Sequence, residues 1–198
     1  MSGRPFFNEG EWCALRRLLR FALSILTTIS FLMPANGNAS AGEPPVALTI
    51  SSSAFSNGGS IPRKFTCDGP DVSASLTWTE PPAGTKSFAI LVDDPDAPAG
   101  NWNHWTMWNL PDTSRGLPEA ASKDARLADG TEQGRNDFGK TGYNGPCPPP
   151  GKPHRYYFKL FALDIRLDLK AGSRKRELEG AMKSHILAQA EWMGTYGR

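Results

Sequence analysis

The 198-residue sequence lacks the motifs that would assign it to several large classes of protein. It contains no P-loop, no glycine fingerprint for a dinucleotide and no serine in a nucleophile elbow. It also lacks an apolar stretch of the roughly 20 residues that a membrane-spanning helix needs, since its main apolar run, residues 21–33, has 13. Histidine is scarce, with three in the chain. Chemistry that depends on an imidazole must therefore use His104, His154 or His185.

Residues 1–41 have the order of a secretory signal peptide. Three arginines between residues 16 and 20 precede the apolar run, and an Ala-x-Ala motif ends at Ala41. We expect cleavage after Ala41, a single mature domain of residues 42–198 and a periplasmic or secreted location. An uncleaved membrane anchor is the alternative, and the paired arginines leave both general and twin-arginine export open.

Residues 42–198 lack a net charge. The first 41 residues hold four of the 22 basic residues and two of the 20 acidic ones, which leaves 18 of each. A basic field suited to nucleic acid is therefore absent, and we expect no nucleic-acid partner. After cleavage of the signal we also expect no stable membrane span.

Cysteine is nearly absent from residues 42–198, where only Cys67 and Cys147 occur, and no C-x-x-C motif is present. An even pair in an exported protein suggests one disulfide, because oxidising compartments allow it. Two free thiols are the alternative at this point.

Glycine and proline, by contrast, are plentiful at 20 and 17 residues, which fits short strands joined by tight turns. The pattern predicts strands at residues 46–52, 75–78, 87–94, 104–111 and 156–164. It predicts a helix along residues 173–192, with Ser173 as N-cap and an apolar stripe from Leu178 to Trp192. Residues 112–143 show no periodicity and are expected to form a long functional surface loop. The expected fold is mostly antiparallel β with a C-terminal helix.

Three polar clusters lie beside the predicted strands: "DDPDAP" (93–98), "NWNHW" (101–105) and "GYNGPCPPPGKPHRY" (142–156). If these strands are neighbours, Asp94, His104, His154 and Tyr156 converge at one rim, where carboxylates fix the imidazole tautomers. Backbone N–H groups around Gly145 would favour an anion there. The alternatives are ordinary Asp-Pro turns, a histidine packed in the core and a solvated, proline-stiffened loop.

The same motifs resemble one family. "DDPDAP", "HW" and "GYNGPCPPPGKPHRYYFKLFALD", together with "KFTCDGPDVSASLTW" and "GRNDFG", are similar to the bacterial, Raf kinase inhibitor-like branch of the phosphatidylethanolamine-binding proteins. The resemblance covers residues 46–198. It implies a β-sandwich-like fold, no cofactor, and a small cavity for anionic groups such as phosphate or a phospholipid headgroup.

The resemblance also implies which residues form that cavity. By matching motifs, the ligand-binding positions are Asp94, Asp96, His104, Gly145, Pro146, His154 and Tyr156. It further implies that Cys67 pairs with Cys147. Such a bond would close a loop of about 80 residues, for which the chain-entropy model gives roughly 4 kcal/mol.

These residues favour an exported binding protein, because no nucleophile adjoins a base. The competing hypothesis is a hydrolase in which His104 or His154 acts as general base, oriented by Asp94 or Asp96. A metal-assisted version would use the same four side chains. A protein-interaction or kinase-regulating role is a third possibility, by analogy of fold alone.

Overall fold

The computed structural model describes residues 47–198, so the expected signal peptide at residues 1–41 lies outside the described residues. The strands form two sheets, and every strand pair within them is antiparallel. The smaller sheet has the order β1-β2-β5, with β1 at Ile50–Ser51, β2 at Leu76–Trp78 and β5 at Gly116–Leu117. A short 3-10 helix, η1 (Arg63–Phe65), lies between β1 and β2 in the chain.

The larger sheet has the order β6-β4-β3-β7-β8. Its strands are β3 (Ser87–Asp94), β4 (Trp102–Pro111), β6 (Glu132–Gln133), β7 (His154–Leu163) and β8 (Ile186–Tyr196). An α-helix, α1 (Lys175–Met182), precedes β8. The expected class, mostly antiparallel β with a helix near the C-terminus, is confirmed.

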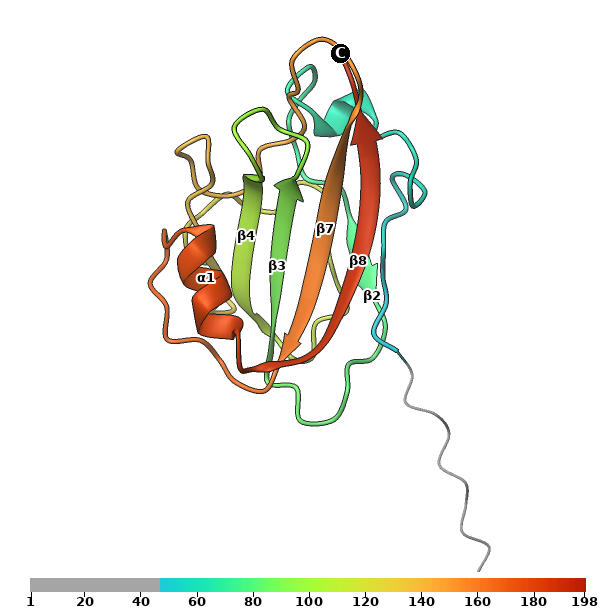
Figure 1. Ribbon diagram of the computed structural model, residues 1–198. Helices are drawn as coiled ribbons and strands as arrows, with labels where there is room; N and C mark the ends of the chain where they lie inside the picture. Colours follow the sequence, from blue (N-terminus) through green and yellow to red (C-terminus); the bar gives the residue numbers. More distant parts are fainter. Residues whose placement is uncertain (1–46) are drawn as a thin grey trace, which may run out of the picture. The chain divides into compact units, whose positions relative to one another are not determined.

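Strand β3 is buried on both faces because a hydrophobic core lies on each side of it. On one face, Phe88, Ile90 and Val92 pack in the main core with Leu76 of the small sheet. On the other face, Ala89 packs in a second core with Leu178 of α1. Figure 1 shows α1 over the β4 side of the large sheet. The large sheet is therefore the middle layer, with its strand ends free to carry a site.

The sequence-based strands agree with the structure to within a few residues. The expected strand at 87–94 coincides with β3, and β4 and β7 each begin two residues before the predicted start. Strand β1 is shorter than expected, since only Ile50 and Ser51 pair with β2.

The predicted helix at 173–192 is wrong in its second half. The helix ends at Met182, and Ile186–Tyr196 is a strand paired with β7 along its whole length. Ala188 and Trp192, four residues apart, fit a helical stripe and equally one face of a strand, where they pack with Ala190 against the main core. At the helix start, the residue in the N-cap position is Arg174 rather than Ser173, and its N–H donates to the Glu177 carboxylate at 2.8 Å.

Residues 112–143 are not simply a surface loop. Strand β6, within this stretch, pairs with β4 and is buried. Its side chains accept hydrogen bonds from two buried indoles: Trp105 Nε1 donates to Gln133 at 2.7 Å and Trp108 Nε1 to Glu132 at 3.0 Å. A buried indole N–H needs an acceptor, and these polar residues provide it.

No helix within residues 47–198 has the length and apolar character required to cross a membrane.

Candidate functional site

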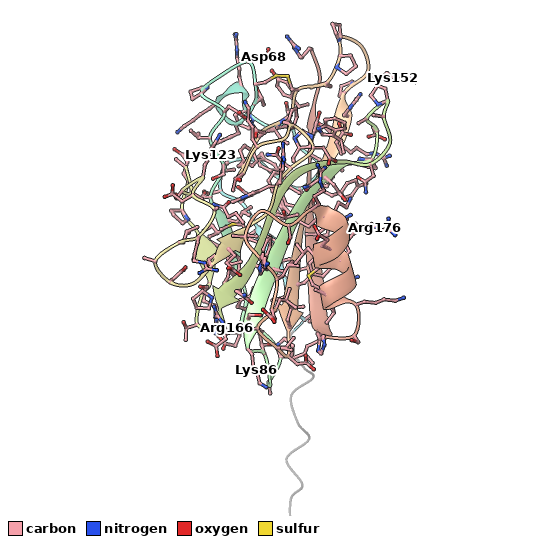
Figure 2. All side chains as sticks on the ribbon, turned by 90° about the vertical axis from the view of Figure 1, so that its left-hand side faces the viewer. Asp68, Lys86, Lys123, Lys152, Arg166 and Arg176 are labelled. Atoms are coloured by element: carbon pink, nitrogen blue, oxygen red, sulfur yellow. A yellow bond between two sulfur atoms is a disulfide. The ribbon has the colours of Figure 1, made fainter. Side chains whose placement is uncertain are left out.

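Three strand ends meet at one edge of the large sheet. Strand β3 ends at Asp94, and its two neighbours, β4 and β7, begin at that edge because both run antiparallel to it. Figure 2 shows Lys152, two residues before β7, at the same end as Asp68, whereas Lys86, just before β3, lies at the opposite end. The antiparallel order thus brings Asp94, His104 and His154 together.

These three side chains line a cavity of about 240 Å³. The rest of its lining is apolar or sulfur-containing and comes from three loops and the first residue of β4: Ala97, Pro98, Ala99, Trp102, Phe138, Cys147, Pro148 and Pro149. The cavity therefore combines one carboxylate and two imidazoles with an apolar rim.

A β-bulge aims His104 toward the cavity. Val92 pairs with Trp105 and Asp93 pairs with Asn103, so His104 is the extra residue of β4. Its Nδ1 lies 2.7 Å from the carbonyl oxygen of Asn144. Because a carbonyl can only accept, this contact places the proton on Nδ1 and leaves Nε2 with a lone pair when the ring is neutral. Burial lowers the pKa of His104 below its usual value and favours that neutral ring.

His154 is held in the same way by a carboxylate. Its Nδ1 donates to Asp94 Oδ2 at 2.7 Å, and both side chains are nearly buried. The other oxygen, Asp94 Oδ1, accepts the N–H of Asp96 at 2.8 Å, which fixes the carboxylate plane. Neither imidazole has an Nε2 partner among the described residues, so both of these nitrogens remain for a ligand.

Tyr156 lies behind the two histidines rather than in the cavity lining. Its ring meets that of His104 edge to face at 5.2 Å and stacks near that of His154 at 6.5 Å. The hydroxyl is buried and has no hydrogen-bond partner within residues 47–198. Burial raises its pKa well above the usual value, so the phenol stays neutral.

Asp96 is turned away from the cavity lining, toward Arg155. Its carboxylate accepts the backbone N–H, Nε and Nη2 of Arg155 at 2.7 to 2.9 Å. This pairing lowers the pKa of Asp96 to about 2. Asp96 thus anchors the loop after β3 to the start of β7.

One wall of the cavity is formed by residues 147–149. Gly145 and Pro146 come just before this wall in the chain and do not themselves line the cavity. The Gly145 N–H donates to Asp71 Oδ1 at 2.6 Å, so it is not the free anion-binding donor that the sequence suggested. The Pro146 carbonyl accepts the N–H of Cys67 at 3.1 Å. Cys147, next in the chain, lines the cavity and is bonded to Cys67 in a disulfide with 5.4 Å between the Cα atoms. The disulfide therefore joins the segment between η1 and β2 to the proline-rich loop before β7, beside the site.

Sequence analysis missed three polar residues that hold this wall. Asn144 donates through Nδ2 to Asp71 at 3.0 Å and accepts from Asn136 Nδ2 at 2.8 Å. Asn136, fully buried, also accepts the N–H groups of Phe138 and Lys140. The asparagines lie in motifs that were noticed, "GRNDFG" and "YNGP", but nothing in one sequence shows that they meet.

Phe138 is the other residue that the sequence did not single out. Its ring contacts Trp102 at 5.6 Å and His104 at 5.2 Å, both edge to face. It is nevertheless 38% exposed, one of three large apolar side chains so exposed among the described residues. An apolar side chain at the mouth of a cavity is a natural contact for a ligand.

No cluster of three or more His, Cys, Asp or Glu side chains suited to a metal ion occurs within residues 47–198. Of the four side chains named for metal-assisted hydrolysis, the carboxylates of Asp94 and Asp96 are bonded to His154 and Arg155, whereas His104 and His154 keep Nε2 available.

The two-sheet fold and its cavity at three strand ends define a small β-rich binding protein. The family model described as phosphatidylethanolamine-binding protein matches residues 51–197. The chain belongs to the phosphatidylethanolamine-binding protein family, which confirms the resemblance seen in the sequence.

Relatives in archaea and bacteria agree with this assignment. The chain is 46% identical over 151 residues to a UPF0098 protein of Methanothermobacter thermautotrophicus, covering 76% of this chain and 99% of that one. It is 42% identical over 198 residues to a UPF0098 protein of Pyrococcus horikoshii, covering 98% and 96%. Among solved structures, YbcL of Escherichia coli, described as a member of the mammalian family, has a TM-score of 0.72 and 37% identity over 76% of this chain and 98% of its own. A homologue from Chlamydia trachomatis gives 0.70 and 40% over 77% and 98%.

Proposed function

We propose that this protein binds a small anionic group, of the phosphate or phospho-headgroup type, in the cavity between Asp94, His104 and His154. One observation carries the proposal. Both imidazoles have Nδ1 committed to a fixed acceptor, and both leave Nε2 available at the same cavity. Two pre-positioned ring nitrogens bind an oxyanion with little ordering cost.

The ligand's contacts follow from those tautomers. His154, paired with Asp94, donates from Nε2 to an anionic oxygen when it is protonated, while Nε2 of neutral His104 accepts the P–OH proton of a singly protonated phosphate group. Tyr156 supports both rings from behind. Asp96, Gly145 and Pro146 act indirectly, by holding the loops that carry the cavity wall.

Calorimetric titration with phenyl phosphate at pH 6 tests this function. We expect both His104→Ala and His154→Ala to weaken binding, and His154→Ala by about tenfold or more, because the protonated His154 ring makes a charge-assisted hydrogen bond. His185→Ala is the matched control, because His185 pairs with Asp164 at the other end of β7. Variants that remain folded and bind as tightly as the parent would refute the proposal.

Hydrolysis is the second candidate, and the Asp94–His154 pair is the observation in its favour. A carboxylate that orients an imidazole at 2.7 Å is the arrangement of a general base. A screen for phosphatase and esterase turnover distinguishes the two functions. Turnover that is lost in His154→Ala would favour the hydrolase.

We also propose that the protein acts after export, in the periplasm or outside the cell. The basic, apolar and small-residue order of residues 1–41 supports this, as does the disulfide between Cys67 and Cys147. Mass spectrometry of the protein from fractionated cells should find the N-terminus at Gly42. A chain that retains residues 1–41 in the cytoplasm would contradict export.

A further inference from the structure

Strand β8 forms one edge of the large sheet, and part of that edge is covered by an earlier segment of the chain. Figure 1 shows β8 on the side of the sheet away from α1, beyond β7. Residues 57–61 cover its C-terminal part. The Gly58 N–H donates to the Met193 carbonyl at 2.8 Å, Asn57 Oδ1 accepts the Met193 N–H at 2.9 Å, and Thr195 bonds to the same segment.

The first part of the edge, Ile186–Trp192, has no such cover, and we call it the open edge. In an antiparallel ladder, alternate residues turn their N–H and C=O groups toward the neighbouring strand and away from it. Since Met193 and Thr195 turn theirs away from β7, Gln189 and Glu191 do so as well. Within residues 47–198, these backbone groups of Gln189 and Glu191 have no hydrogen-bond partner.

The open edge also lacks the usual protection of a free strand. Such an edge is a template for another strand, and proteins commonly protect it with lysine, proline or a covering loop. Its sequence, "ILAQAEW", contains neither lysine nor proline. Ile186 and Leu187 are 39% and 42% exposed, and with Phe138 they are the large apolar side chains so exposed among the described residues. An unprotected and partly apolar edge indicates a strand partner.

The limits of the open edge favour a second copy of this chain as that partner. The edge begins where β8 begins, at Ile186, and ends at Trp192, just before the covered Met193. Its midpoint is Gln189. Two copies can therefore pair antiparallel over the whole open edge, about a two-fold axis at Gln189, without displacing the covering segment. A register shifted by one residue would place Leu187 of the second copy against Met193, where the covering segment lies.

The side chains are compatible in this register. Gln189 faces Gln189 of the second copy, and two amides can exchange hydrogen bonds across the axis. Glu191 faces Leu187 of the second copy, so the two Glu191 positions lie about 13 Å apart along the strands. No like charges are therefore placed opposite each other.

The geometry points to a two-fold homodimer in which the open edges of two β8 strands pair and join the two large sheets into one. His154, which lines the cavity, pairs with Tyr196 at the far end of β8, so both cavities stay outside the interface. One short strand pair buries less area than a permanent dimer needs, and we expect a dissociation constant in the micromolar range. The dimer goes beyond the proposed function and does not depend on it.

Sedimentation equilibrium of residues 42–198 tests the dimer. Two solved structures match this chain over 98% of their own length and 77% or less of this one, so the domain folds without residues 1–41. We expect the parent to pass from monomer to dimer as its concentration rises.

Charged residues at Gln189 test the position of the axis. Gln189→Lys places two positive charges opposite each other and Gln189→Glu two negative ones, so each should weaken the dimer by about tenfold or more at low salt. An equimolar mixture of the two variants should restore it, because the residue on the axis faces its own counterpart. Lys152→Glu, an exposed change at the opposite end of the molecule from Lys86, is the control for altered charge and should leave the dimer unchanged.

A second pair of variants tests the backbone pairing. Gln189→Pro removes an N–H that points away from β7, so the domain should stay folded while the dimer weakens by about tenfold or more. Gln189→Thr keeps that N–H and should dimerise within about threefold of the parent.

Two results would overturn the dimer. One is a parent that stays monomeric at about 1 mM, which would leave the open edge to a different partner. The other is a dimer that Gln189→Lys, Gln189→Glu and Gln189→Pro all leave intact, since it would use another face. Both results leave the proposal of anion binding standing.

Discussion

His104 and Asn144 exchange two hydrogen bonds across the floor of the site. The imidazole Nδ1 donates to the Asn144 carbonyl at 2.7 Å, and the Asn144 N–H donates to the His104 carbonyl at 3.2 Å. The proline-rich segment is therefore bound to β4 at a residue that lines the cavity. The tautomer of His104 depends on where that segment lies, and Asp71 and Asn136 hold Asn144 there from either side.

Asp71→Asn tests this support. The Asp71 carboxylate accepts from both Asn144 Nδ2 and the Gly145 N–H, and an amide must turn a donor toward one of them. We expect a loss of about 1–3 kcal/mol in the free energy of unfolding. Ligand affinity should fall severalfold, with a changed ¹⁵N shift of His104.

Asp68→Asn is the control, because Asp68 bonds to Tyr196 and Arg198 and not to the cavity wall. Unchanged affinity and an unchanged His104 spectrum in Asp71→Asn would show that the support is not needed.

Gly145→Ala should displace the same wall. A Cβ at this position would lie 2.1 Å from the Phe65 carbonyl oxygen, so backbone must move. We expect destabilisation by about 2 kcal/mol or more, measured by urea unfolding, together with weaker ligand binding. Gly180→Ala in α1, where nothing lies within 4 Å of the new Cβ, should instead be neutral or stabilise by up to about 1 kcal/mol. Equal effects of the two changes would contradict the argument.

Removing the disulfide with Cys67→Ser and Cys147→Ser should destabilise the domain. The two residues are 80 apart in the chain, and the loop-entropy model gives a loss of about 4 kcal/mol. Chemical denaturation measures the loss. Alkylation of the unfolded parent protein without reductant should label neither cysteine, and labelling of both would contradict the bond.

Burial of neutral His104 makes stability depend on pH. Its pKa in the folded state lies below the ordinary value of 6.5, so the unfolded chain takes up a proton that the folded chain does not. Above pH 6.5 the neutral ring costs the folded state nothing. Below that pH the free energy of unfolding falls, by up to about 1.4 kcal/mol per pH unit. Asp96, whose pKa is lowered from 3.8 to about 2, acts in a separate window below pH 4.

Urea unfolding at pH 7.5 and pH 5 measures the histidine contribution, and His104→Gln should reduce the loss between these pH values. The same loss in parent and variant would assign it to other groups.

The three strands that carry Asp94, His104 and His154 could be predicted from patterns in the sequence, whereas their being neighbours was a condition of the prediction that the structure supplies. The sequence shows two apolar strands, β3 and β7, and an alternating one, β4, each with a polar cluster at one end. Once these strands are antiparallel neighbours, the clusters lie at the same edge of the sheet. The supports of the wall could not be found this way, because Asp71 and Asn144 are 73 residues apart and meet only in the folded chain. Likewise, the stripe that predicted a helix to Trp192 consists partly of even-numbered residues, which a strand also places on one face. Pairing with β7 decided between the two.

The most direct measurement is a ¹H–¹⁵N imidazole spectrum recorded during titration with phenyl phosphate at pH 6. The chain has three histidines, so two report on the cavity and His185 serves as an internal reference. The account predicts that the Nε2 signals of His104 and His154 shift together with one dissociation constant while those of His185 stay in place. Binding that leaves both His104 and His154 unperturbed would contradict it.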